Sequence, residues 1–209
     1  MTILINMAQT TLYLMRHGEC EGGNTLRGHC DVALTEIGFA QMQLAYAKLP
    51  EMVDRVVSSP LMRCAKFAHY IARKRDVNVS LDERLKEIYF GRWDGQLIPK
   101  LYAEHGAELT AYWQNPWLHP LPEGELMSTF EQRLDEVVEQ LVTEHCEEKL
   151  LIITHGGVIR HLMAKALGVS QAVGFYTQLS LEYASVVKIT HFRDEDGTCH
   201  WRLHWGESI

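Results

Sequence analysis

The segment that decides the fold is LYLMRHGE, residues 12–19, in which a short apolar run ends in an arginine, a histidine and a glycine. A brief apolar run that contains an aromatic residue and precedes turn residues is typical of a buried strand. A second segment of this kind, LLIITHGG, spans residues 150–157. Because ligands of open α/β sheets bind at the carboxyl ends of the strands, the two segments predict one pocket that holds His17 and His155.

The residues beside the two histidines are suited to binding an anion. Arg16 carries a planar fork of donors that matches the oxygens of a phosphate. Gly156 and Gly157 open a helix expected over 158–167, and unpaired backbone N–H groups at a helix start point towards an anion. A lone His-Gly pair after a strand is usually only a turn. Two such pairs with an arginine favour a phosphate site that contains an imidazole.

Strand and helix patterns alternate along the chain, which favours an α/β fold: a three-layer α/β/α sandwich with a mostly parallel central sheet. The 209 residues fit a single domain. The other elements that we expect are helices at 34–49, 59–75 and 125–146, and strands at 55–57, 77–81, 181–190 and 199–205. The last two strands are expected to meet at a hairpin turn formed by Asp196-Gly197.

Two of the expected helices have specific start signals. Thr35 is the expected N-cap of the helix at 34–49, in which Gly38 is an awkward interior residue. Ser59 is the expected cap of the next helix, with Pro60 in its first position and Arg63 in its first turn. The apolar stripe predicted for the first helix consists of Ile37, Ala40, Met42, Leu44, Ala45 and Leu49.

Composition restricts the class of partner. The formal net charge of −7 argues against nucleic-acid binding. We find neither a secretory signal nor an apolar run of membrane-spanning length, so the expected location is cytoplasmic, with no membrane partner. The histidines and cysteines lack metal-site spacing, and we expect no metal and no cofactor. Trp201 and Trp205, expected to be exposed, leave room for a homodimer.

Five cysteines without a pairing pattern indicate a reducing compartment. Cys20 and Cys64 lie close in sequence to the predicted site. We interpret both as bystanders rather than nucleophiles.

Four blocks in the sequence resemble those of the histidine phosphatase superfamily, the phosphoglycerate mutase-like group. They are RHGE (16–19), SSPLMRCA (58–65), LKEIYFGRWDG (85–95) and THGG (154–157), in the order and spacing of the family. The resemblance extends over most of the chain. It implies one histidine phosphatase domain over residues 1–209, in which residues 96–125 form a partly helical cap over the pocket.

The resemblance implies a role for each residue of the predicted pocket. His17 is the expected nucleophile, which attacks phosphorus as a neutral imidazole whose pKa nearby arginines lower. Arg16, Arg63 and His155 form the expected phosphate clamp, with His155 acting best as a protonated donor, and the Gly156 N–H is an expected phosphate donor.

An ester leaving group also needs a general acid, and Glu87 is the expected one. By proximity alone Asp82 or Glu83 would serve as well, but the family match of LKE (85–87) ahead of FG (90–91) selects Glu87.

One loop departs from the family pattern. Many members place a phosphate-binding asparagine six positions after the nucleophilic histidine, whereas here Gly23 takes that position and Asn24 follows. Asn24 and Arg27 are therefore candidate phosphate ligands, Arg27 as a substitute contact.

The expected function is that of a metal-independent phosphomonoesterase acting on a small-molecule phosphate ester. Segments 16–23, 31–35 and 122–125 look most like bacterial α-ribazole 5′-phosphate phosphatases, which act in cobalamin nucleotide-loop assembly. Trp113, Trp117 or Tyr112 could stack on a flat benzimidazole, or simply pack against one another. The alternatives are a phosphoglycerate mutase-like enzyme, a broad-specificity small-metabolite phosphatase, or a phosphate-binding module without turnover.

Overall fold

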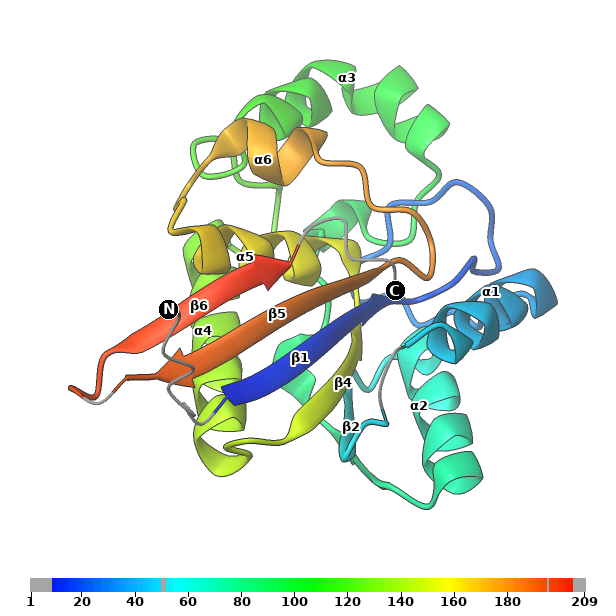
Figure 1. Cartoon of the computed structure of the whole chain (residues 1–209). Helices are drawn as coiled ribbons and strands as arrows, with labels where there is room; N and C mark the ends of the chain where they lie inside the picture. The colour runs from blue at the N-terminus through cyan, green and yellow to red at the C-terminus, as the bar shows by residue number, and fades with distance from the viewer. Residues whose placement is uncertain (1–8, 50–51, 195, 205–209) are drawn as a thin grey trace.

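The computed structural model describes residues 9–49, 52–194 and 196–204. Within these ranges a six-stranded sheet has the order β3-β2-β4-β1-β5-β6, and β5 runs against the other strands. Helices lie beside the sheet (Figure 1). The predicted α/β fold with a mostly parallel sheet is confirmed. The strands are β1 (Gln9–Arg16), β2 (Arg55–Ser58), β3 (Asn78–Leu81), β4 (Lys149–Thr154), β5 (Val186–Arg193) and β6 (Cys199–His204).

Strand β1 is at the centre of the core because both of its faces are apolar. Leu12 and Leu14 are buried with residues of α4 (Met127–Glu144) and α5 (Gly156–Leu167) on one face of the sheet. Tyr13 and Met15 are buried on the other face, with residues of α1 (Glu36–Ala47) and α2 (Met62–Arg75). This alternation along one strand produces the three layers.

The ends of several elements differ from the prediction. Helix α2 begins at Met62 after Leu61, not at Ser59, because the Ser59 hydroxyl lies 2.8 Å from the ring of His155 instead of capping the helix. Strand β5 begins at Val186 rather than at residue 181, whereas the predicted antiparallel hairpin to β6 is confirmed.

Helix α1 is capped by Thr35 as predicted, since the Thr35 Oγ1 accepts a hydrogen bond from the Gly38 N–H at 2.9 Å. Its predicted apolar stripe is right for Met42, Ala45 and Leu49, which pack in the core, and wrong for Ile37, Ala40 and Leu44. Met42 is buried, but Ile37 and Leu44 are exposed to solvent, because the helix lies on the molecule with its Gly38–Met42 face inward.

The segment over residues 96–125 contains α3 (Ile98–Gln114), which bends at His105. In Figure 1 α3 lies beyond the end of the sheet, near the short helix α6 (Val173–Gln178). Short 3₁₀ helices at Glu83–Leu85 and Gly91–Trp93 precede it.

Trp201 on β6 is half-buried against the core, so the expectation that it is exposed is wrong. Trp205 lies outside the described residues. No helix in the described ranges has the length and apolar character needed to cross a membrane.

Two glycines allow the loop after β1 to lie directly on α1. A Cβ atom at Gly18 would lie 2.0 Å from the Gly38 carbonyl oxygen, and a Cβ at Gly38 would lie 2.0 Å from the Glu19 carbonyl oxygen. Because these contacts are with backbone, no side-chain rotation can relieve them. The interior glycine of α1 is therefore required by the position of the loop that follows His17.

We predict that Gly38→Ala destabilises the protein. Alanine favours a helix over glycine by about 1 kcal/mol, but overpacking against rigid backbone costs about 1–3 kcal/mol, and here the clash is severe. Urea denaturation should show a net loss of stability. Gly106→Ala is the control, since its Cβ would meet nothing closer than 4.0 Å, and this variant should not be destabilised. A Gly38→Ala variant as stable as the wild type would contradict the prediction.

Candidate active site

The structure brings the two strand-end histidines together. Strands β1 and β4 are parallel neighbours with Arg16 opposite Thr154. The His17 N–H donates to the Thr154 carbonyl at 3.0 Å. The ring centroids of His17 and His155 are consequently 5.3 Å apart, at one edge of the sheet, as the sequence predicts.

A cavity of about 220 Å³ lies at this edge. It contains several residues that the sequence singles out, but neither Arg63 nor His155 is on its wall. The lining residues are Arg16, His17, Asn24, Thr25, Leu26, Arg27, Glu87, Phe90, Ile98, Trp113, Gly157, Arg160, Tyr176 and Tyr183.

His17 has one ring nitrogen held and the other available. Its Nδ1–H donates to the Gly18 carbonyl oxygen at 2.8 Å, which leaves the Nε2 lone pair without a partner among the described residues. Burial, and then the charge of Arg63, lower the pKa of His17 to about 3. The imidazole is therefore neutral at physiological pH, and its Nε2 carries an available lone pair.

His155 is completely buried and is held from both sides. Its Nδ1 accepts a hydrogen bond from Arg63 Nε at 3.3 Å, and its Nε2 lies 2.8 Å from the Ser59 Oγ. Burial and the adjacent Arg63 charge put the pKa of His155 well below its ordinary value. Arg63 donates to the nitrogen that would carry the second proton of a protonated ring, and the expected role of His155 as a protonated donor stays a prediction. Ser59 is not the helix cap that the sequence predicts.

Arg63 is also fully buried, and three of its five N–H groups have partners. Its Nη2 donates to the Gly28 carbonyl at 2.7 Å and its Nη1 to the Cys30 carbonyl at 2.8 Å. The side chain thus braces the loop at 28–30, and its charge lowers the pKa of His17. The expected role of Arg63 in binding phosphate stays a prediction.

Two other guanidinium groups face the cavity near the start of α5. Arg16 donates to the Leu181 carbonyl and lies over the Tyr183 ring at 4.6 Å, but its buried Nε has no partner. Arg160 Nε donates a hydrogen bond to the Leu179 carbonyl at 2.8 Å. An added Cβ at Gly156 would lie 3.2 Å from Arg160 Nη1 and 3.6 Å from Arg16 Nε, so both cations meet at this glycine.

Arg160 is a residue that the sequence analysis missed. Its position four residues after Gly156 puts both on one face of α5, and this spacing is the signal that could have found it.

The loop that departs from the family pattern also reaches the cavity. Asn24 is exposed and lines it. Arg27 lines it as well, while its Nη2 donates to the Glu21 carbonyl at 2.9 Å and to the Gly23 carbonyl. Both candidate ligands are therefore within the cavity, although Arg27 is partly committed to folding its own loop.

The Glu87 carboxyl group is fixed by backbone donors. Its Oε2 accepts from the Gly157 N–H at 3.0 Å, and its Oε1 accepts from the Ile88 N–H at 3.1 Å. A Cβ at residue 157 would lie 2.3 Å from Glu87 Oε1, so any side chain there would displace this carboxyl group. The Gly157 N–H, expected to be free for a substrate anion, is bound to this carboxylate.

Asp82 and Glu83, the other candidates for the general acid, form contacts elsewhere. Asp82 caps a 3₁₀ helix and pairs with Arg84 at 2.7 Å, whereas Glu83 pairs with Lys86 at 2.5 Å. Neither lines the cavity, which agrees with the selection of Glu87.

The aromatic residues of the segment at 96–125 divide between the core and the cavity. Trp113 lines the cavity that contains His17. Tyr112 is buried against Trp113, with ring centroids 4.8 Å apart. Trp117 packs on Tyr176 at 5.8 Å, outside this cavity. Only Trp113 of the three is thus placed to stack on a substrate there.

Two buried cysteines lie behind the histidines. Cys20 Sγ is 3.4 Å from His17 Nδ1, and Cys64 Sγ is 3.7 Å from His155 Nε2. Burial raises the pKa of both thiols, so neither is an activated nucleophile. Among the described residues, no group of three or more His, Cys, Asp or Glu side chains could hold a metal ion.

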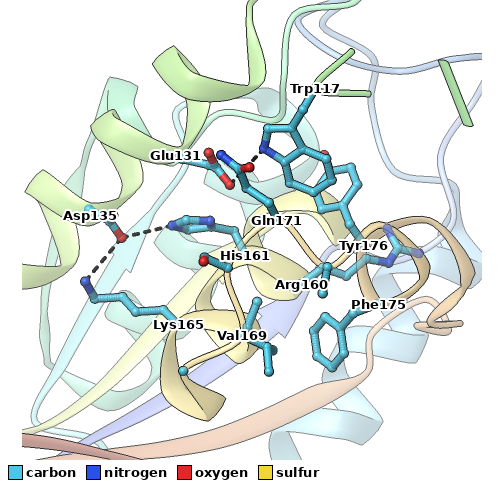
Figure 2. A pocket seen from close by; sticks show the side chains of 14 residues that line it. Trp117, Glu131, Asp135, Arg160, His161, Lys165, Val169, Gln171, Phe175 and Tyr176 are labelled. Atoms are coloured by element: carbon cyan, nitrogen blue, oxygen red, sulfur yellow. Dashed lines mark hydrogen bonds and ion pairs between the residues drawn. The ribbon is translucent and has the colours of Figure 1, made fainter. Parts of the chain in front are cut away.

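A larger cavity, of about 330 Å³, adjoins the first across Arg160 and Tyr176 (Figure 2). Asp135 in its wall contacts His161 at 2.9 Å and Lys165 at 3.3 Å. Arg160 lies on the opposite side of this cavity from Asp135 (Figure 2). Arg160 thus lines both cavities, whereas Arg16 and Arg27 line only the first.

Comparison with known proteins agrees with this geometry. The model of the histidine phosphatase superfamily, branch 1, matches residues 12–203. The chain belongs to that superfamily.

Individual relatives differ in the substrates that their names state. A Hydrogenobacter thermophilus protein named "Putative phosphoserine phosphatase 2" is 30% identical over 201 residues, 91% of this chain and 97% of the relative. The adenosylcobalamin/alpha-ribazole phosphatase of Salmonella typhimurium is 31% identical over 190 residues, 89% and 86% of the two chains. The solved structure of Bacillus stearothermophilus YhfR superposes with a TM-score of 0.81 at 29% identity, covering 93% and 96%.

We predict that the two buried neutral histidines make stability fall in acid. The unfolded chain binds protons below about pH 6.5, whereas the pKa of His17 in the folded state is about 3. The contribution of each such histidine to the free energy of unfolding is therefore complete above pH 6.5. It falls by about 1.4 kcal/mol for each pH unit below that value. Urea denaturation between pH 7 and 4 should show this slope.

His17→Asn should reduce the slope of the free energy of unfolding against pH by about 1.4 kcal/mol per pH unit, since the asparagine amide does not titrate. His119→Asn, at an exposed position, controls for the loss of one imidazole. Equal slopes in the two variants would contradict the prediction.

Proposed function

We propose that the protein is a phosphomonoesterase that works through a phosphohistidine intermediate on His17. The observation that carries this proposal is the state of that ring, which is neutral, is held by its Nδ1–H, and has Nε2 available at a cavity with unpaired guanidinium donors. Glu87 lines the same cavity and can serve as a proton donor.

In the first step His17 Nε2 forms a bond to phosphorus while the bond from phosphorus to the leaving oxygen breaks. The Glu87 carboxyl proton passes to that oxygen. Arg16, Arg27 and Arg160 stabilise the charge that spreads over the three equatorial oxygens. The charge of Arg63 helps to keep the His17 ring neutral.

In the second step a water oxygen bonds to phosphorus while the bond from phosphorus to Nε2 breaks. The Glu87 carboxylate takes the water proton, and inorganic phosphate leaves. A phosphoryl dianion beside His155 would favour the imidazolium form of that ring, which the sequence analysis expects. No step needs a metal ion.

The segment at 96–125 acts, in this proposal, as a cap within a single domain. Two of its residues, Ile98 and Trp113, form part of the wall of the cavity. A cap of this kind would restrict the size of the leaving group and exclude water during the first step.

The first candidate substrate is α-ribazole 5′-phosphate, in cobalamin assembly in the cytoplasm. The Salmonella relative at 31% identity supports it. So does Trp113, whose face could cover a flat benzimidazole.

A second candidate is a small acidic phosphoester such as phosphoserine. Arg16, Arg27 and Arg160 all line the cavity, and three cations are more than one phosphoryl dianion requires. The Hydrogenobacter relative supports this alternative.

We expect His17→Ala to lower kcat/KM by at least about a thousandfold, because it removes the nucleophile and with it the two-step route. Base-quenched wild-type enzyme should retain label from a ³²P-labelled ester on His17. A variant that keeps full activity, or label found on another residue, would rule out the mechanism.

The substrate is tested by phosphate release from α-ribazole 5′-phosphate, phosphoserine and p-nitrophenyl phosphate, with a chelator present. A preference of about a hundredfold for α-ribazole 5′-phosphate corresponds to about 2.7 kcal/mol of transition-state discrimination and would support the first candidate. A preference for phosphoserine would favour the second. Loss of activity in the chelator would count against the metal-independent reaction.

A further inference from the structure

One arginine outside the cavity directs three of its donors at the segment that carries Glu87. Arg133 on α4 donates through Nη1 to the Arg84 carbonyl at 2.5 Å and to the Lys86 carbonyl at 2.8 Å, and through Nη2 to the Glu87 carbonyl at 3.0 Å. These three carbonyls lie within four residues, 84–87, at the end of the short 3₁₀ helix. A single guanidinium therefore fixes the backbone that leads to the general acid.

The same guanidinium is itself fixed by a carboxylate. Arg133 Nε and Nη2 bind the two oxygens of Glu125 at 2.6 and 2.8 Å, in a bidentate pair that is largely buried. Glu125 also accepts from the Tyr89 N–H at 3.2 Å, and its own N–H donates to the Tyr89 carbonyl at 2.8 Å. The pair thus holds the chain on both sides of Glu87.

These contacts engage all the N–H donors of the Arg133 guanidinium. A guanidinium has five N–H groups, and Arg133 makes five hydrogen bonds, two to Glu125 and three to backbone carbonyls. Lysine cannot replace this pattern, since its ammonium has three donors on a single atom.

We propose that Arg133, clamped by Glu125, is a positioning residue for the proton transfer by Glu87. The Glu87 carboxyl group is bound only to the backbone N–H groups of Ile88 and Gly157 among the described residues. Its place relative to the leaving oxygen therefore depends on the path of the chain at 84–89. Arg133 binds three carbonyls of this stretch, whereas Thr154 binds the Leu85 carbonyl and His29 the Glu87 carbonyl with one contact each. This inference rests on the proposed role of Glu87.

The test uses the dependence of the rate on the leaving group. Departure of an alkoxide needs a proton, whereas departure of 2,4-dinitrophenolate does not. The quantity to measure is kcat/KM for glycerol 2-phosphate and for 2,4-dinitrophenyl phosphate, because kcat/KM reports the steps up to loss of the leaving group. The ratio of the two values is independent of the fraction of enzyme that is folded.

Arg133→Lys keeps the charge beside Glu125 but loses the fork. We expect kcat/KM for glycerol 2-phosphate to fall at least about tenfold, a part of the 10²–10⁴ that general acid catalysis contributes, while the value for the dinitrophenyl ester changes less than about threefold. Equal losses for both esters, or no loss for either, would overturn the proposal.

Two further variants separate this proposal from the proposed function. Glu87→Gln should show the same split, and more strongly. If Glu87→Gln instead lowers both values equally, Glu87 is not the acid, and the proposed mechanism fails first. A split in Glu87→Gln without one in Arg133→Lys overturns only the role of Arg133. Arg92→Lys is the matched control: Arg92 pairs with Glu123 at 2.6 Å on the surface and should leave both rates unchanged.

Discussion

The pairing of β1 with β4 is the constraint on which the rest of the site depends. Its parallel register sets Arg16 opposite Thr154 and so brings two histidines, far apart in the chain, to adjacent strand ends. The loop after His17 can then turn only by lying on α1, where Gly18 and Gly38 have no side chains to prevent the approach. The start of α5, which follows His155, likewise receives the Glu87 carboxylate at Gly157.

Charge at the site is arranged in two shells with different tasks. Arg63 and His155 lie behind the cavity and hold each other, the loop at 28–30 and Ser59. Arg16 and Arg160 lie on the wall of the cavity, and each has donors without a partner among the described residues. Burial of His17 and the charge of Arg63 keep the imidazole neutral, while Arg16 and Arg160 have donors available for an anion. The two tasks therefore do not compete for the same donors.

The sequence was sufficient for features that depend on neighbouring residues. Apolar runs gave the strands, Thr35 gave a helix start, and the His-Gly pairs gave the edge where the cavity lies. It failed where a side chain is used by a distant segment. Ser59 has the residue type of a cap, yet its hydroxyl is taken by His155, 96 positions away. Arg63 has the spacing of a phosphate ligand, but the sequence did not indicate that it also binds two carbonyls of an earlier loop. Such competition is decided by tertiary contacts, which no local pattern encodes.

The partners of Arg63 have a consequence for how the site responds as a reaction proceeds. They are two carbonyl dipoles and a neutral imidazole, and no carboxylate in the described part of the chain forms an ion pair with it. Its positive potential is thus permanent and unneutralised, in an interior where water cannot screen it. Because the group is immobile, it would not have to reorient while the phosphoryl group moves from the ester to the ring and on to water in the proposed reaction. The reorganisation energy that a solvent would demand is already met by the fold.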